Sequence, residues 1–394
     1  MSISIQDIKK ALARSKQEHG LLERLGARYY RHLGNTSGTA SLSNRAIDEL
    51  PDDLTLQVLA TNITTFAVII AFAIGAITTF VTIWFEVRYS GTMKMATYYF
   101  LYGTILIIML VVELVVLYWL GLKTVHSLAC LTGHHQSHED IFLPVNDSVP
   151  NILARAALEV PDPVIHHLGI EPLKHLSKSK LFLVAALYKA KVILTSMMVR
   201  YLLIRLLGKG GSRTAFTWVA IPITGLWDAF TLYKVARDAR LRLFGLKLAE
   251  HIANNVLTDD LIVRLSPAAR EGAIRAVASS MVLAQNYHPN LLVLLLRLSH
   301  AFECKEGIDY DNWEDFLTIL NQAPDAERYF LMDLLSVCAA FDGRLSRMEQ
   351  HHLPEAFQDL TDLYMNRVRQ LTKMLVSGRL HAAKALCALN FTPG

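Results

Sequence analysis

Two long apolar runs dominate the first third of this chain. Residues 63–85, ITTFAVIIAFAIGAITTFVTIWF, carry no charged side chain, and residues 97–122 carry only Glu113. A helix of about 20 apolar residues is long enough to cross a bilayer core roughly 30 Å thick. A short polar segment with a Ser-Gly pair separates the runs. The pattern therefore predicts a transmembrane hairpin within residues 57–122.

A second hairpin is predicted over residues 181–244, with more charge in it. Its first half is apolar but contains Lys189 and Arg200, and its second half contains Asp228. The two cations are eleven residues apart, so they project from nearly the same side of a helix. They form either a polar stripe that faces a partner helix, with Asp228 as the counter-charge, or the polar face of a hairpin on the membrane surface.

The rest of the chain shows helical periodicity and no convincing alternating strand pattern. Residues 1–56 contain a predicted amphipathic helix at 5–33 and a Ser/Thr/Gly linker, and prolines divide residues 123–180 into short helices. Residues 245–394 predict a separate helical domain. The predicted fold is all-α, a helical integral membrane protein with a cytoplasmic helical domain.

The distribution of basic residues predicts the orientation. Lysines and arginines gather before the first hairpin and after the second, whereas the turn between the first two helices has only Arg88 and Lys94. Because cytoplasmic flanks carry the excess of Lys and Arg, we expect a multi-pass inner-membrane protein with both termini in the cytoplasm. A net charge of +4 over 394 residues is too small to indicate a nucleic-acid partner. The expected partners are the lipid bilayer and cytoplasmic or membrane proteins.

The stretch AAFDGRLSRMEQHH carries the first candidate site. Asp342 and Glu349 are spaced like the fifth and twelfth positions of a calcium loop. Cys338 and Ala340 would then take the first and third positions, where a calcium loop needs oxygen ligands. The stretch is therefore not an EF-hand.

A structural interpretation of the same stretch is a capped turn between two helices. Asp342-Gly343 is turn chemistry, since glycine adopts a positive φ at little cost. Ser346 and Glu349 have the spacing of a capping box, in which each side chain accepts a backbone N–H of the other residue. Such a cap stabilises a helix by about 1 kcal/mol.

The same residues resemble the TerB domain of tellurite-resistance proteins. The resemblance is an apolar helix that ends in Ala-Ala-x-Asp-Gly and is followed by Leu, Ser and Glu; it rests on Asp342, Gly343, Leu345, Ser346 and Glu349. It implies an all-α fold, a link to bacterial stress responses and membrane-bound complexes, and a divalent metal such as Ca²⁺ or Mg²⁺. The implied ligands are Asp342 and Glu349, with Asp333, Glu355 and Asp359 nearby. In the first half of the domain, Asn286 and His288 stand where the family has acidic residues.

A second resemblance covers residues 219–245. A Pro and a Gly within an apolar helix, followed by a basic amphipathic helix, resemble EcsC-like bacterial membrane-associated proteins. This resemblance implies membrane association and no particular activity.

A histidine-rich segment, GHHQSHED, is a candidate for zinc. His134 and His138 lie four residues apart and would share one face of a helix. The alternative is a solvated cytoplasmic loop, since HEXXH is absent. No P-loop, nucleophile elbow or dinucleotide motif is present either, so we expect a protein that is not an enzyme.

A carboxylate inside an apolar span is costly and is a functional hypothesis in itself. Glu113 is expected to be protonated, to pair with Lys189 or Arg200, or to line an ion path. The alternative is that it lies near the inner interface and only fixes helix packing. The predicted function is a non-catalytic scaffold or sensor, anchored in the membrane and acting through protein partners in a bacterial envelope or toxic-anion stress response. The alternative is an ion channel or transporter subunit that uses Glu113 and Asp228. Small residues such as Ala71 and Gly75 would permit self-assembly into a homo-oligomer.

Overall fold

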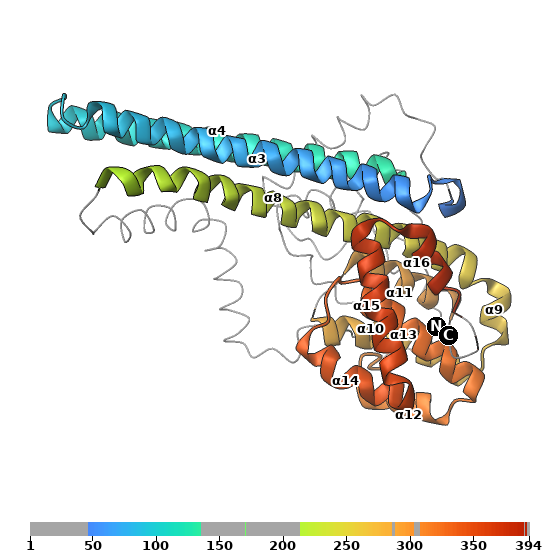
Figure 1. The fold of residues 1–394 in the computed structure, drawn as a ribbon. Coiled ribbons are helices and arrows are strands. Elements are labelled where there is room, and N and C mark those ends of the chain that lie inside the picture. The colour runs from blue at the N-terminus through green and yellow to red at the C-terminus, as the bar shows by residue number, and fades with distance from the viewer. Residues whose placement is uncertain are drawn as a thin grey trace. The chain divides into compact units, whose positions relative to one another are not determined.

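The computed structural model describes residues 46–134, 170, 213–285, 288–302, 308–389 and 391 (Figure 1). Within these ranges the chain forms helices joined by turns and contains no strand, so the all-α prediction is confirmed for them. The amphipathic helix predicted at 5–33, its linker, and the candidate residues Lys189, Arg200 and His138 lie outside the described residues.

The helices are α3 (Asp53–Tyr89), α4 (Met95–Thr132), α8 (Arg213–His251), α9 (Asp259–Arg264), α10 (Pro267–Ala284), α11 (Pro289–Ala301), α12 (Trp313–Gln322), α13 (Asp325–Ala340), α14 (Arg347–Phe357), α15 (Thr361–Ser377) and α16 (Leu380–Leu386). Shorter elements are the 3₁₀ helices η1 (Ile47–Glu49) and η4 (Gln358–Leu360) and the π-helix η3 (Ile252–Val256). The chain divides into two compact units. The described parts of residues 62–124 and 176–236 form the apolar unit, and the other described residues form the helical domain.

The apolar unit contains most of α3 and α4, which are joined by a short turn. Of the helices that the structure describes, these two are long and apolar enough to cross a membrane, with mean hydropathies of 2.4 and 2.7. Both extend beyond the apolar runs seen in the sequence. The start of α3 is fixed by Asp52, whose carboxylate accepts the Thr55 hydroxyl at 2.6 Å and the Thr55 backbone N–H at 3.3 Å.

The third helix of the apolar unit is the first part of α8. Its buried positions, which include Thr224, Asp228 and Leu232, recur at the spacing of one helix face. Leu232 packs with Ala67 and Ala71 of α3 and with Leu120 of α4. The small side chains of α3 therefore allow α3 and α8 to approach closely.

The helical domain is built around α10, which is buried along nearly its whole length. Helices α11, α12, α13 and α14 pack against it, and α13 in turn packs on α15. Ser266 caps α10 by accepting the Ala269 N–H at 3.2 Å, and its own N–H and hydroxyl donate to Glu327 of α13, both at 2.7 Å. Helix packing and capping thus join the central pair of helices.

The last turns of α8 belong to the core of this domain. Leu241, Phe244 and Leu248 are almost completely buried. Two glycines with positive φ make room for the first two: a Cβ on Gly343 would lie 2.3 Å from Leu241, and one on Gly378 would lie 3.1 Å from Phe244. The domain start predicted at residue 245 therefore lies inside a continuous helix.

The first described turns of the chain also pack in the helical domain. The Asp53 carboxylate accepts the backbone N–H groups of His381 and Ala382 at 2.8 and 2.9 Å, at the start of α16. Lys384 donates to both carboxylate oxygens of Asp48 at 2.6 and 2.7 Å. The beginning of α3 and the C-terminal helix are therefore held together by charged side chains.

Candidate functional site

The turn between α13 and α14 holds the first candidate site. Gly343 has a φ of +80°, and the Asp342 carboxylate accepts the Arg344 N–H at 3.1 Å. The capping box predicted for Ser346 and Glu349 is present: Ser346 Oγ accepts the Glu349 N–H at 3.0 Å, and Glu349 Oε2 accepts the Ser346 N–H at 2.7 Å. The Ser346 hydroxyl also donates to the Leu283 carbonyl at 2.7 Å, which ties the turn to α10.

The electrostatics of this turn are unusual because the buried carboxyl group of Glu349 lies near the half-buried carboxyl group of Asp342. Burial, together with repulsion from Asp342, raises the pKa of Glu349 to about 8. Burial also raises the pKa of Asp342 to about 6, although the Arg344 N–H and charge act against the rise. Glu349 Oε1 is buried and has no hydrogen-bond partner among the described residues. The pair is therefore suited to take up a proton near neutral pH.

The other acidic residues implied by the TerB resemblance do not join this pair. Asp333 is buried in an ion pair with Arg367, at 2.5 Å, and Glu355 accepts the Trp313 indole N–H at 2.8 Å. Asp359 lies in η4. The described part of the chain contains no group of three or more His, Cys, Asp or Glu placed to hold a metal.

A divalent cation at Asp342 and Glu349 stays a prediction, and the donor count limits which ion it can be. Ca²⁺ takes six to eight oxygen ligands, which two carboxylates fall short of. Mg²⁺ keeps several waters and is held by one or two protein carboxylates, so it fits this donor set better. Bound there, Mg²⁺ would offset the repulsion between the two carboxylates, as uptake of a proton by the pair also does.

The candidate carboxylates of the apolar unit are both buried, with Glu113 only 3% exposed and Asp228 4% exposed. Glu113 Oε2 accepts the Thr78 hydroxyl at 2.8 Å, which links α4 to α3. Asp228 lies directly against Gly75, where a Cβ would come within 2.2 Å of its Oδ2. Lys189 and Arg200, the predicted partners of Glu113, lie outside the described residues.

The small residues expected at an oligomer interface are used inside this chain. Ala71 belongs to the buried cluster of α3, α4 and α8, and Gly75 is buried against α8. Self-assembly through these residues stays a prediction.

His134 lies just after α4 with both ring nitrogens engaged. Its Nδ1 is 3.0 Å from Thr132 Oγ1, and its Nε2 is 2.9 Å from Glu250 Oε1. Burial alone would raise the pKa of Glu250, but the attraction and hydrogen bonds of His134 and Lys247 lower it below its usual value. His134 thus joins the end of α4 to α8, and zinc binding with His138 stays a prediction.

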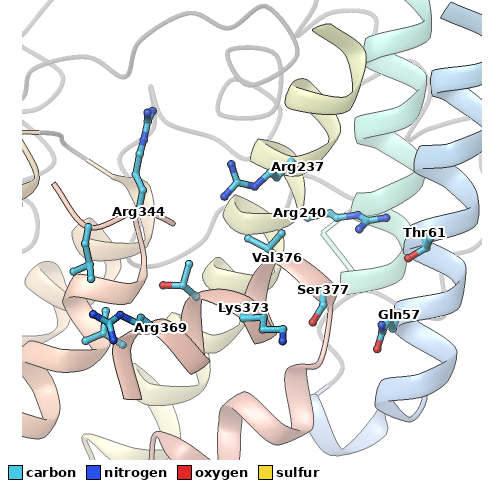
Figure 2. A pocket seen from close by; sticks show the side chains of 12 residues that line it. Gln57, Thr61, Arg237, Arg240, Arg344, Arg369, Lys373, Val376 and Ser377 are labelled. Carbon is cyan, nitrogen blue, oxygen red and sulfur yellow. The ribbon is translucent and has the colours of Figure 1, made fainter. Parts of the chain in front are cut away.

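One feature of the helical domain was not predicted from the sequence. It involves Arg237 and Arg240, two of the basic residues near the end of the second predicted hairpin. They lie on α8 and face the same pocket as Arg369 and Lys373 of α15 (Figure 2). The signal was present in the spacing, since basic residues three or four positions apart share one face of a helix. The sequence did not reveal that the two faces meet.

No protein-family model matches the chain, and no curated protein or solved structure matches it. The TerB-like and EcsC-like resemblances therefore rest on the residues that carry them.

Proposed function

We propose that this chain is a non-catalytic scaffold or sensor of the bacterial inner membrane. In this proposal the α3–α4 hairpin anchors the chain in the bilayer, and the helical domain acts on the cytoplasmic side through protein partners. The observation that carries the proposal is the exposed apolar surface of the hairpin.

The most apolar windows of α3 and α4 are only 33% and 22% buried. Large apolar side chains such as Phe66, Ile69, Ile77, Val111 and Val115 are 51–68% exposed. A contiguous apolar surface of this size in water would cost about 25 cal/mol for each Å² left exposed. Lipid is the solvent that fits such a surface.

The polar side chains of these helices also fit an apolar solvent. The hydroxyls of Thr82 and Thr104 donate to backbone carbonyls in the preceding turn of their own helices, both at 2.8 Å. In a bilayer core no water is present to satisfy polar groups, so such internal hydrogen bonds are required. Aromatic residues around the α3–α4 turn, among them Trp84 and Tyr98, suit a membrane–water interface.

The anchoring and its orientation can be tested with reporter fusions in bacteria. Alkaline phosphatase, which is active only outside the cytoplasm, would follow residue 92, and green fluorescent protein would follow residue 394. Both reporters should be active in their separate fusions. An inactive phosphatase fusion, or a chain recovered with the soluble proteins, would overturn the proposal.

A substitution test separates lipid contact from other causes of sedimentation. The pair Ile69→Arg and Val111→Arg places two charges in the proposed bilayer core, where each costs roughly 2.5–3.5 kcal/mol on insertion scales. The matched control is Val263→Arg, at a position of α9 that is 72% exposed in the helical domain. The fraction of the chain recovered with the membranes should fall for the double variant and stay at the wild-type level for the control.

The stress-response part of the proposal rests on the TerB-like resemblance. The highest tellurite concentration that permits growth should be lower for cells that lack the gene than for the parent. The wild-type gene should restore the parental value. A gene that lacks the hairpin should not restore it, because the helical domain would no longer be held at the membrane. Equal tellurite limits with and without the gene would remove this part.

The two buried carboxylates of the apolar unit favour a second candidate, an ion channel or transporter subunit. Intramembrane carboxylates are commonly found on ion and proton paths. Protein-dependent flux into liposomes that is lost in Glu113→Gln would favour transport. Equal leakage with and without the protein would favour a packing role, in which the Thr78–Glu113 hydrogen bond joins α3 and α4.

A further inference from the structure

The helical domain contains an open pocket whose polar lining is strongly basic. Its volume is about 540 Å³, and it lies among α8, α15, the α13–α14 turn and the start of α3 (Figure 2). Five of its twelve lining residues are cationic, and none is Asp or Glu: Arg237, Arg240, Arg344, Arg369 and Lys373. We propose that this pocket binds a phosphate-bearing anion.

The charges in the pocket differ from those elsewhere in the domain. Arg242 pairs with Asp238 at 2.8 Å, and Arg275 pairs with Glu271 at 2.8 Å. By contrast, no carboxylate among the described residues forms an ion pair with Arg237, Arg369 or Lys373. Cations held near one another repel, and an anion placed among them relieves that repulsion.

The backbone positions the cations independently of any ligand. Arg369 and Lys373 are four residues apart on α15, so both lie on the same helix face. Arg240 is fixed by donating from its guanidinium to the Ala60 carbonyl of α3. Because helices hold the backbone of most of these residues, binding an anion has to order only their side chains.

Phosphate chemistry fits this lining better than a single carboxylate does. Arginine guanidinium groups match phosphate oxygens with two parallel hydrogen bonds, and several cations suit a group that carries more than one charged oxygen. Thr61 adds a neutral hydroxyl that can donate to the same oxygens. Val368 and Val376 give the pocket an apolar part, which suits a phosphate attached to an organic group.

Two sources can supply this chemistry: the headgroup of an anionic phospholipid, or a soluble phosphate compound. The lipid source rests on the proposed membrane anchor. On α3, Thr61 is two residues before the uncharged run that starts at Ile63. In a membrane-anchored chain, the pocket would therefore lie near the level of the headgroups. The soluble source needs no membrane.

The test uses the full-length chain purified in an uncharged detergent. One arm measures binding of phosphatidylglycerol against phosphatidylcholine in mixed micelles, and the other measures binding of inorganic pyrophosphate by calorimetry. The variant Arg369→Gln/Lys373→Gln removes two exposed cations that form no hydrogen bond or ion pair with another described residue. The control Arg264→Gln/Arg347→Gln removes the same charge from exposed positions on α9 and α14, outside the pocket.

We expect the pocket variant to weaken binding by roughly tenfold or more, and the control to change it by less than about twofold. Phosphatidylglycerol binding that pyrophosphate does not displace would identify a lipid headgroup; pyrophosphate binding with the same variant dependence would identify a soluble ligand. Equal binding by both variants, or no binding in either arm, would overturn the proposal. A chain that binds pyrophosphate but does not enter membranes would leave the pocket standing and remove the anchor.

Discussion

At the level of single residues, the carboxyl group of Glu349 has two opposing roles. It completes the capping box of α14, where a negative charge near the helix N-terminus is favourable. It is also buried beside Asp342, where that charge is unfavourable. The raised pKa shows that burial and repulsion outweigh the cap, so the protonated form is favoured at neutral pH.

Glu349→Gln should flatten the pH dependence of stability. The folded pKa of Glu349 is about 8, against an ordinary value of 4.5, so between these values the folded chain holds one proton more than the unfolded chain. The free energy of unfolding should therefore fall as the pH rises through this window, by at most about 1.4 kcal/mol per pH unit. The substituted amide cannot titrate but keeps an oxygen for the Ser346 N–H, so the variant should be more stable than the wild type above pH 8.

The measurement is the melting temperature of the purified full-length chain between pH 5 and pH 9. Glu355→Gln is the control, since Glu355 is exposed and its hydrogen bond from Trp313 helps to lower its pKa. If the wild type and Glu349→Gln gave parallel curves, the turn would not titrate in this range.

Asp342→Ala tests the predicted cation in the same turn. Mg²⁺ competes with protons for the two carboxylates, so calorimetry should give weak binding at pH 8, less at pH 6 and none in the variant. Asp342→Ala should also lower the pKa of Glu349, because one source of repulsion is gone. Heat of equal size in the wild type and the variant would place the cation elsewhere.

At the level of helices, the close approach of α3 and α8 depends on glycine. A Cβ on Gly225 would lie 2.8 Å from the Phe72 carbonyl oxygen and 2.9 Å from its ring. Backbone cannot move aside as a flexible side chain can. The contact between these two helices therefore has no room for one further carbon atom.

Gly225→Ala should destabilise the apolar unit by about 1–3 kcal/mol, the usual cost of overpacking. Gly103→Ala is the matched control, because a Cβ at Gly103 of α4 meets nothing within 4 Å. The control should be neutral or slightly stabilising, since alanine is the better helix former. Melting curves in detergent would show the difference, and equal shifts in both variants would mean that the α3–α8 contact has room for a methyl group.

Helices were predictable from the sequence wherever their causes were local. The apolar runs of α3 and α4 and the Ser-x-x-Glu cap of α14 are each contained in a few consecutive turns. The burial of Leu241 and Phe244 was not predictable, because the partners that allow it, Gly343 and Gly378, lie more than a hundred residues away. The basic pocket was not predictable for the same reason, since the residues that line it come from segments far apart in the sequence.

At the level of the whole molecule, the start of α3 and α16 are held together in the helical domain. Asp53, in the first turn of α3, accepts two backbone N–H groups at the start of α16, and Asp48 pairs with Lys384. The sequence alone predicts a separate segment for residues 1–56. The pattern of apolar residues indicates where a helix is buried, but it does not indicate what the polar residues at the end of the helix contact.

Asp53→Ala should loosen α16 without unfolding the rest of the domain. It leaves the N–H groups of His381 and Ala382 without an acceptor, at a cost of about 1–3 kcal/mol. Hydrogen exchange of the backbone at residues 380–387 should become faster, whereas exchange in α10 should not change. Glu49→Ala removes a neighbouring exposed carboxylate and serves as the control. Unchanged exchange in α16 would show that its packing alone holds it.

Arg344 belongs to two parts of the helical domain at once. It lines the basic pocket, and its charge acts on the half-buried Asp342 carboxyl. An anion bound beside Arg344 partly neutralises the charge of its guanidinium group. That charge then stabilises the Asp342 carboxylate less, so the pKa of Asp342 rises further. Thermodynamic linkage makes the effect reciprocal: protonation of Asp342 strengthens anion binding by the same free energy. Anion binding in the pocket should therefore take up protons from the buffer. Binding of a membrane lipid or a metabolite would in this way change the charge of the α13–α14 turn.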